Sequence, residues 1–91
     1  MHDPSAAPRA AATLRVALFA GMAELAGGRT LDLPWQEGTV GDLRRALAAA
    51  HPRLGPLLAR SAVARGTSYV PDDARLASGD DVAVIPPVSG G

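Results

Sequence analysis

The chain has 91 residues with a formal net charge of zero, and 47% of its residues are apolar although only 3% are aromatic. That length fits one small domain whose core is built from aliphatic side chains, with no need of disulfides or metal to hold it. The absence of cysteine excludes disulfides, thiol catalysis and cysteine-type zinc sites. Zero net charge argues against nucleic-acid binding, and no segment approaches the roughly 20 apolar residues of a membrane span. All nine basic residues are arginine, so no lysine is present to accept an isopeptide bond.

Three regions are expected along the chain. Residues 1–12 contain two prolines and lack the apolar segment of a secretion signal, which predicts a disordered arm and a cytoplasmic protein. Residues 13–85 carry the hydrophobic patterning of a folded domain. Residues 86–91 form a tail rich in proline and glycine.

The first half of the domain predicts two strands and a helix. Apolar side chains alternate over residues 13–20, where Leu14, Val16 and Leu18 share one face. A short helical turn over residues 21–26 leads through two glycines to a second strand over residues 29–33, with Leu31 and Leu33 toward the core. A helix then begins at Thr39, because Thr39 and Asp42 have the spacing of a capping box. Its buried stripe is expected to contain Val40, Leu43, Leu47 and Ala50.

Pro52 is expected to stop this helix, and a second short helix follows over residues 54–59. The last third predicts strands over residues 62–65 and 68–70, joined at Gly66, and a terminal strand over residues 81–85. This order of elements indicates an α+β fold of the β-grasp (ubiquitin-like) type, in which one main helix packs across one face of a mixed sheet.

No cluster of side chains predicts an active site within the domain. The only acidic cluster, Asp72, Asp73, Asp80 and Asp81, lies in turn sequences, where paired aspartates are usually turn formers, so no metal site is expected. His2 and His51 lack the neighbours of a catalytic triad, and no phosphate-binding glycine motif is present.

A candidate interaction surface lies on the other face of the first strand. If the first and last strands are neighbours, Ala17 and Phe19 lie beside Ala83 and Ile85 and form an apolar patch opposite the helix. Exposed apolar patches tend to mark protein interfaces. The alternative is that the segments around Trp35 or Leu54 fold over Phe19 and bury it.

The tail Pro86-Pro87-Val88-Ser89-Gly90-Gly91 is the second candidate. Prolines extend the chain away from the domain, and glycine has no Cβ to obstruct a narrow channel. These residues are therefore expected to carry the Gly91 carboxylate into another protein's active site. A frayed terminus is the alternative.

Three segments resemble the MoaD/ThiS sulfur-carrier family, which includes the small subunit of molybdopterin synthase. They are Val16-Ala17-Leu18-Phe19-Ala20 with Glu24-Leu25-Ala26-Gly27, the helix start Thr39-Val40-Gly41-Asp42-Leu43, and the ending from Gly79 to Gly91. The resemblance covers residues 14–91. The sequence departs from the family at Ala23, where arginine is frequent, and at Ala64-Arg65-Gly66, where Ala-Val-Asn is common; Gly66 can adopt the same left-handed turn.

The resemblance implies that the tail carries the function and that the chain itself binds no cofactor. A ubiquitin-activating-like adenylyltransferase would use MgATP to adenylate Gly91, and a sulfurtransferase or cysteine desulfurase would then supply sulfur for a thiocarboxylate. The tail from Pro86 to Gly90 would insert into the large subunit of molybdopterin synthase, which would hold the catalytic side chains, and the sulfur would pass to cyclic pyranopterin monophosphate. The family resemblance also marks Phe19 and Ile85 as contacts with the large subunit.

Three other functions remain open from the sequence. The chain can be a sulfur carrier for thiamine or cysteine synthesis, although Pro-Pro-Val-Ser before Gly-Gly is unusual there. It can be a ubiquitin-like modifier that joins Gly91 to other proteins. It can also be an interaction module whose tail is chemically inert.

Overall fold

The computed structural model describes residues 12–87, and its secondary structure runs from Thr13 to Ile85. The expected arm, apart from Ala12, and the tail residues Val88, Ser89, Gly90 and Gly91 lie outside the described residues. The elements in chain order are β1 Thr13–Leu18, α2 Ala20–Ala26, β2 Thr30–Pro34, β3 Glu37–Thr39, α3 Val40–Ala50, the 3-10 turn η1 Pro52–Leu54, α4 Gly55–Leu58, β4 Ala62–Arg65, β5 Ser68–Val70, β6 Arg75–Ala77 and β7 Asp81–Ile85.

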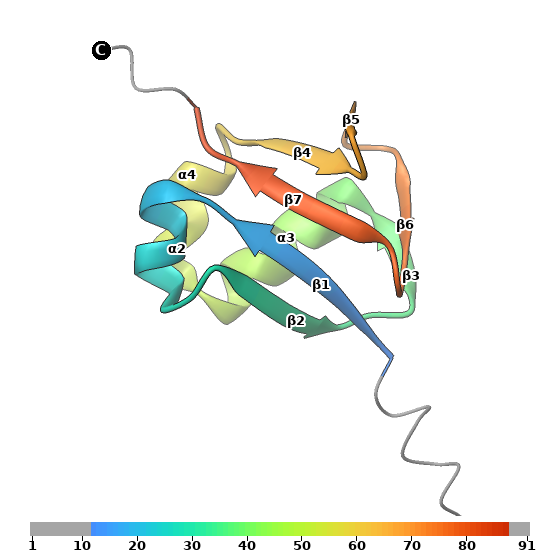
Figure 1. Cartoon of the computed structure of the whole chain (residues 1–91), viewed down its shortest axis with the longest axis horizontal. Helices are drawn as coiled ribbons and strands as arrows, with labels where there is room; N and C mark the ends of the chain where they lie inside the picture. Colours follow the sequence, from blue (N-terminus) through green and yellow to red (C-terminus); the bar gives the residue numbers. More distant parts are fainter. Residues whose placement is uncertain (1–11, 88–91) are drawn as a thin grey trace, which may run out of the picture.

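The main sheet has five strands in the order β2-β1-β7-β4-β5 (Figure 1). The central pair, β1 and β7, is parallel, and Leu18 lies opposite Val84. The pairs β1–β2, β4–β7 and β4–β5 are antiparallel. The sheet is therefore mixed, and the first and last strands are neighbours as the sequence predicted.

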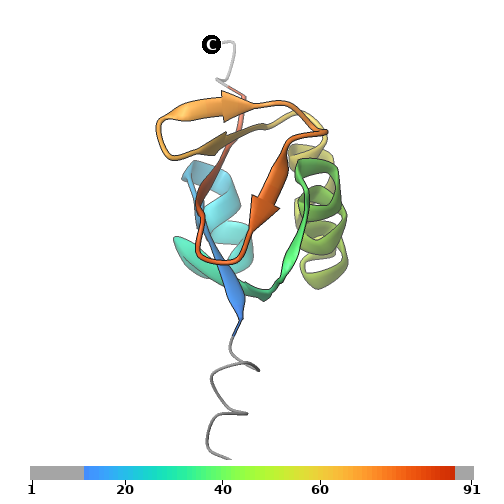
Figure 2. The ribbon, with the colours of Figure 1, turned by 90° about the vertical axis from the view of Figure 1, so that its right-hand side faces the viewer.

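Helix α3 packs across one face of this sheet and forms a separate layer (Figure 2). Its buried residues are Val40, Leu43 and Leu47, and they contact the inward side chains of the strands, including Leu14, Val16, Val63, Val82 and Val84. This arrangement confirms the β-grasp fold. The prediction that Ala50 is buried is wrong: Ala50 is exposed because it is the last helical residue, at the point where the chain leaves the core.

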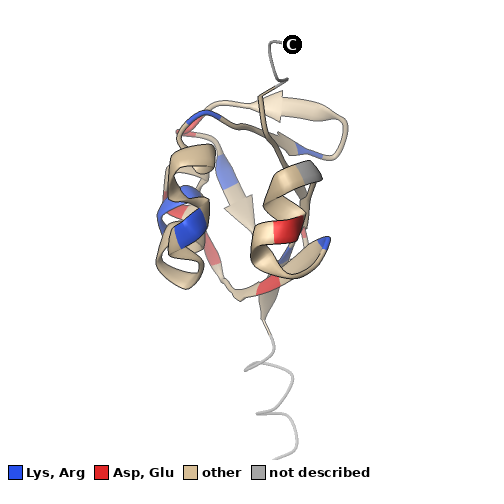
Figure 3. Ribbon diagram, turned by 90° about the vertical axis from the view of Figure 1, so that its left-hand side faces the viewer, with Lys and Arg blue, Asp and Glu red and all other residues tan. Residues whose placement is uncertain are grey.

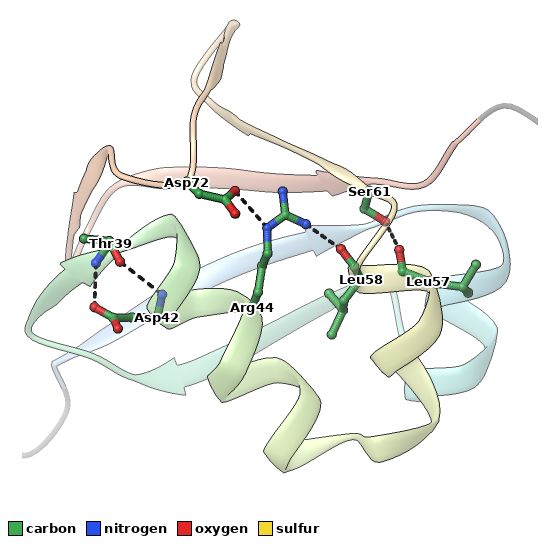
Figure 4. A network of polar contacts seen from close by, with 7 residues as sticks. All are labelled: Thr39, Asp42, Arg44, Leu57, Leu58, Ser61 and Asp72. Atoms are coloured by element: carbon green, nitrogen blue, oxygen red, sulfur yellow. Dashed lines mark hydrogen bonds and ion pairs between the residues drawn. The ribbon is translucent and has the colours of Figure 1, made fainter.

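The start of α3 confirms the predicted capping box (Figure 4). The backbone N–H of Asp42 donates to Thr39 Oγ1 at 3.1 Å, and the N–H of Thr39 donates to Asp42 Oδ2 at 2.9 Å. Two amides that have no partner within the helix are thereby satisfied. The same bond from Thr39, followed by the neighbouring Arg45 guanidinium, lowers the pKa of the Asp42 carboxyl.

A small second sheet, β3 with β6, was not expected from the sequence. Each strand has three residues, which is too short for an alternating pattern, and Gly38 pairs with Leu76 far along the chain. Trp35 lies buried beside this sheet and its Nε1 donates to the carbonyl of Leu76 at 3.0 Å. Gly38 is needed here, because a Cβ at that position would lie 3.0 Å from the Trp35 ring.

The first strand is shorter than predicted. β1 ends at Leu18, and Phe19 is the extended residue that precedes α2, so residue 20 already belongs to the helix. Gly27 closes α2 with a positive φ of 85°, where glycine avoids the cost of a side chain. Within residues 12–87, no helix is both long and apolar enough to cross a membrane.

Candidate functional site

A row of small and apolar residues crosses the outer face of the main sheet, opposite α3. Ala17 lies opposite Ala83, Ala83 opposite Ala64, and Ala64 opposite Tyr69. Side chains of paired residues point to the same face of a sheet, and successive residues alternate. The neighbours of this row, such as Val84, belong to the core cluster that includes α3, so the row itself lies on the opposite face, where Ala64 is only 7% exposed.

Phe19 and Ile85 complete this surface at one end of the sheet. Leu18 pairs with Val84 in the parallel register, so the next residues along both strands, Phe19 and Ile85, lie beside one another. Phe19 is 48% exposed and Ile85 is half-buried. Together, six residues form the outer-face patch: Ala17, Phe19, Ala64, Tyr69, Ala83 and Ile85.

Nothing in the described part of the chain folds over Phe19 and buries it. The alternative that Trp35 or Leu54 covers this residue is wrong, because both belong to the core, with 9% and 0% of their surface exposed. Of the described residues, only Phe19 and Tyr69 are large apolar side chains with substantial exposure. Such exposed aromatic side chains are typical of protein interfaces.

Tyr69 was missed by the sequence analysis, although it is 70% exposed and belongs to the patch. The strand predicted over residues 68–70 was too short to show which face of the sheet the Tyr69 side chain occupies. A signal was nevertheless present in the turn: Gly66 has a φ of 62°, and the pairing of Arg65 with Ser68 makes a two-residue hairpin loop. A hairpin of that length places Tyr69 opposite Ala64, and hence on the outer face.

The tail leaves the domain at the same end of the sheet. β7 ends at Ile85, and the two described residues that follow are Pro86, which is partly buried, and Pro87, which is exposed. Neighbouring strands lie about 5 Å apart, so Phe19 is beside the start of the tail. The predicted carrier residues from Val88 to Gly91 lie outside the described residues.

Most ionised side chains outside the patch form contacts that hold the fold. Arg15 contacts Asp32 at 3.1 Å across β1 and β2, and Arg44 contacts Asp72 at 3.0 Å. The Arg44 guanidinium also donates to the carbonyl of Leu58, which ties α3 to α4 (Figure 4). Figure 3 shows the molecule from the side of the helices. Basic residues gather on the helix α3, which carries Arg44 and Arg45, whereas α2 carries an acidic residue.

The acidic cluster noted in the sequence is divided among separate structural roles. Asp72 is paired with Arg44, and Asp80 Oδ2 accepts a bond of 2.8 Å from the N–H of Ala77 in the turn before β7. Among residues 12–87, no three His, Cys, Asp or Glu side chains are grouped as metal ligands are. The bond from Ala77 agrees with the interpretation of Asp80 as a turn former.

The outer-face patch has the chemistry of a recognition surface. Its side chains are alanine, isoleucine, phenylalanine and tyrosine, which bury apolar area but supply no general base or nucleophile activated by one. Together with the sheet order and the single main helix, this defines a ubiquitin-like β-grasp domain that presents one face of its sheet and the strand leading to its tail.

Comparison with known proteins identifies the family. The model of the ThiS family matches residues 16–91. The chain therefore belongs to the ThiS family.

The similar proteins include both sulfur carriers and a protein modifier. A molybdopterin synthase sulfur carrier subunit of Dictyostelium discoideum is 36% identical over 81 residues, covering 85% of this chain and 94% of the relative. Small archaeal modifier protein 1 of Haloferax volcanii is 40% identical over 83 residues, covering 81% and 95%. A crystal structure of the H. volcanii modifier superposes with a TM-score of 0.73 at 36% identity, covering 85% of this chain and 99% of the other.

Proposed function

We propose that this chain is the sulfur-carrying small subunit of molybdopterin synthase, and that Gly91 is the residue that carries the sulfur. The observation that supports this most directly is the family match, which runs through Gly90 and Gly91 to the last residue of the sequence. The similarity to the molybdopterin synthase sulfur carrier subunit of D. discoideum, matched over 94% of its length, supports the choice of this pathway.

The chemistry of the proposal begins with activation of the Gly91 carboxylate. A carboxylate resists nucleophilic attack because oxide is a poor leaving group. A ubiquitin-activating-like adenylyltransferase would consume MgATP, form the acyl adenylate and release pyrophosphate. The terminal sulfur of a persulfide on a sulfurtransferase or cysteine desulfurase would then attack the carbonyl and expel AMP, and a thiol would cleave the sulfur–sulfur bond to leave a thiocarboxylate.

The outer-face patch is the proposed contact with the large subunit. Phe19 lies beside the strand that continues into Pro86, so binding through Phe19 and Ile85 would position the tail at the partner's active site. There the thiocarboxylate would transfer its sulfur to cyclic pyranopterin monophosphate. In this proposal the small subunit works in the cytoplasm, binds no cofactor of its own, and relies on the large subunit for acid–base groups.

The decisive experiment measures the intact mass of the protein after incubation with MgATP, the activating enzyme and a sulfur donor. Replacement of one oxygen by sulfur, localised to Gly91 by fragmentation, supports the proposal. An unchanged mass, with an activating enzyme shown to be competent on another carrier, contradicts it. Addition of the large subunit and cyclic pyranopterin monophosphate should then restore the original mass, whereas a thiocarboxylate that persists would indicate the thiamine or cysteine pathway.

A second candidate is a protein modifier, which is favoured by the 40% identity to small archaeal modifier protein 1. In that case the amine of a lysine on another protein would displace AMP from the adenylate and form an amide with Gly91. The same incubation, performed in a cell extract, distinguishes the two functions. A covalent adduct of this chain on other proteins supports the modifier, and a free thiocarboxylate supports the carrier.

A further inference from the structure

A surface hollow of about 540 Å³ lies beside Phe19, at the end of the sheet from which the tail leaves. Its walls come from three elements: the end of β1, the helix α2 and the start of β2. A backbone bond of 2.7 Å from the N–H of Leu18 to the carbonyl of Arg29 holds two of these walls together. The hollow is therefore formed by the folded domain itself.

The hollow is continuous with the outer-face patch. Ala17 and Phe19 belong to both, so a partner that covers the patch also reaches the hollow. Ala23 forms part of its wall on α2, and its single methyl group leaves space where a longer side chain would fill it. The apolar part of the hollow thus has room for one side chain of a bound protein.

Two charged residues, Glu24 and Arg29, also line the hollow. Neither makes an ion pair with a residue of the described segment 12–87, in contrast to Arg44 and Arg45 on α3, which contact Asp72 and Asp42. The guanidinium of Arg29 therefore makes no direct ion pair within that segment, although Glu24 lines the same hollow. A partner carboxylate placed beside Arg29 would form a pair at the edge of the contact, where such pairs mainly affect specificity and association rate.

We propose that this hollow receives an apolar side chain of the large subunit, on a segment that also places a carboxylate beside Arg29. The inference rests on the proposed function, since it takes the large subunit as the protein that covers the patch. A second hollow, of about 310 Å³ between α3 and α4, shares no residue with the first. Its arginines are already paired with Asp72 and Asp42, and it shares no residue with the outer-face patch.

The test fills the hollow and measures the dissociation constant for the purified large subunit by calorimetry. Ala23→Leu is expected to weaken binding by about tenfold or more, the effect of losing one well-packed contact. The matched control is Ala48→Leu: Ala48 is likewise a half-buried alanine on a helix, but it lines the second hollow. The control should change the affinity by less than about twofold, as expected away from the contact.

A second variant, Arg29→Glu, tests the charge without filling the hollow. Repulsion from the partner carboxylate should weaken binding by about threefold to tenfold at low salt, with a smaller effect at high salt because exposed charges are screened. Unchanged affinity of both Ala23→Leu and Arg29→Glu, with the wild type binding normally, would overturn the inference and leave the proposed function intact. The same holds if Ala23→Leu impairs only adenylation, because the hollow would then serve the activating enzyme. No binding by the wild type would instead refute the proposed function, and the inference with it.

Discussion

Substitution of Phe19 by alanine should weaken binding of the large subunit by about 60-fold. A phenylalanine side chain buries on the order of 150–250 Å² when fully covered. Because Phe19 is 48% exposed in the free domain, a partner can still cover roughly 100 Å² of it. At about 25 cal/mol per Å² this corresponds to about 2.5 kcal/mol, and each 1.4 kcal/mol is a factor of about ten in affinity.

The assay is titration calorimetry of this protein into the large subunit of molybdopterin synthase, with thermal unfolding of each variant as the control for folding. Phe19→Arg should weaken binding further, because the contact would then bury an unpaired charge. Arg53→Ala provides a control, since Arg53 is exposed, lies in η1 and is outside the outer-face patch. An affinity of Phe19→Ala within about twofold of the wild type, at a preserved Tm, would show that the large subunit does not cover Phe19.

Three further results are expected. Deletion of Gly91 should abolish sulfur transfer while Tm stays unchanged, because every buried apolar residue in the described range lies between Leu14 and Val84; a large loss of Tm would contradict this. Thr39→Ala should destabilise the fold by about 1 kcal/mol through loss of the cap, which lowers Tm by about 4–8 °C in a domain of this size; an unchanged Tm would show that the cap contributes little. The lowered pKa of Asp42 stabilises the folded state above the unfolded value near 3.8, and this contribution is lost as the pH falls through the folded value. The Tm difference between wild type and Asp42→Asn should therefore be present at pH 7 and shrink as the pH is lowered below 3.8, whereas a constant difference across that range would refute the linkage.

Much of the fold could be predicted because its signals are local. The strands over residues 62–65, 68–70 and 81–85 agree with β4, β5 and β7 at both ends, since glycine, proline and aspartate mark their boundaries. The start of α3 was equally clear, because a capping box requires only Thr39 and Asp42 three residues apart. Ala50 was assigned wrongly because helical periodicity does not reveal where a helix extends beyond the core.

The candidate site was predictable only in part. Ala17, Phe19, Ala83 and Ile85 were identified by alternation, on the condition that the first and last strands pair. That condition joins residues far apart in sequence, and no local pattern establishes such a pairing. Tyr69 was missed although the two-residue loop at Gly66 places it opposite Ala64, whereas the hollow between β1, α2 and β2 was not foreseen because it depends on several elements meeting at once.

The sequence by itself determined the class of domain and the buried faces of its main elements, since each follows from composition or spacing. Tertiary structure decided that β1 and β7 run parallel, that Phe19 and Tyr69 stay exposed on one face, and that a hollow opens beside the start of the tail. The physical reason is that the exposure of a side chain and the register of a strand result from packing between segments far apart in the sequence. The loss of chain entropy in bringing these segments together is offset only when all the elements pack at once.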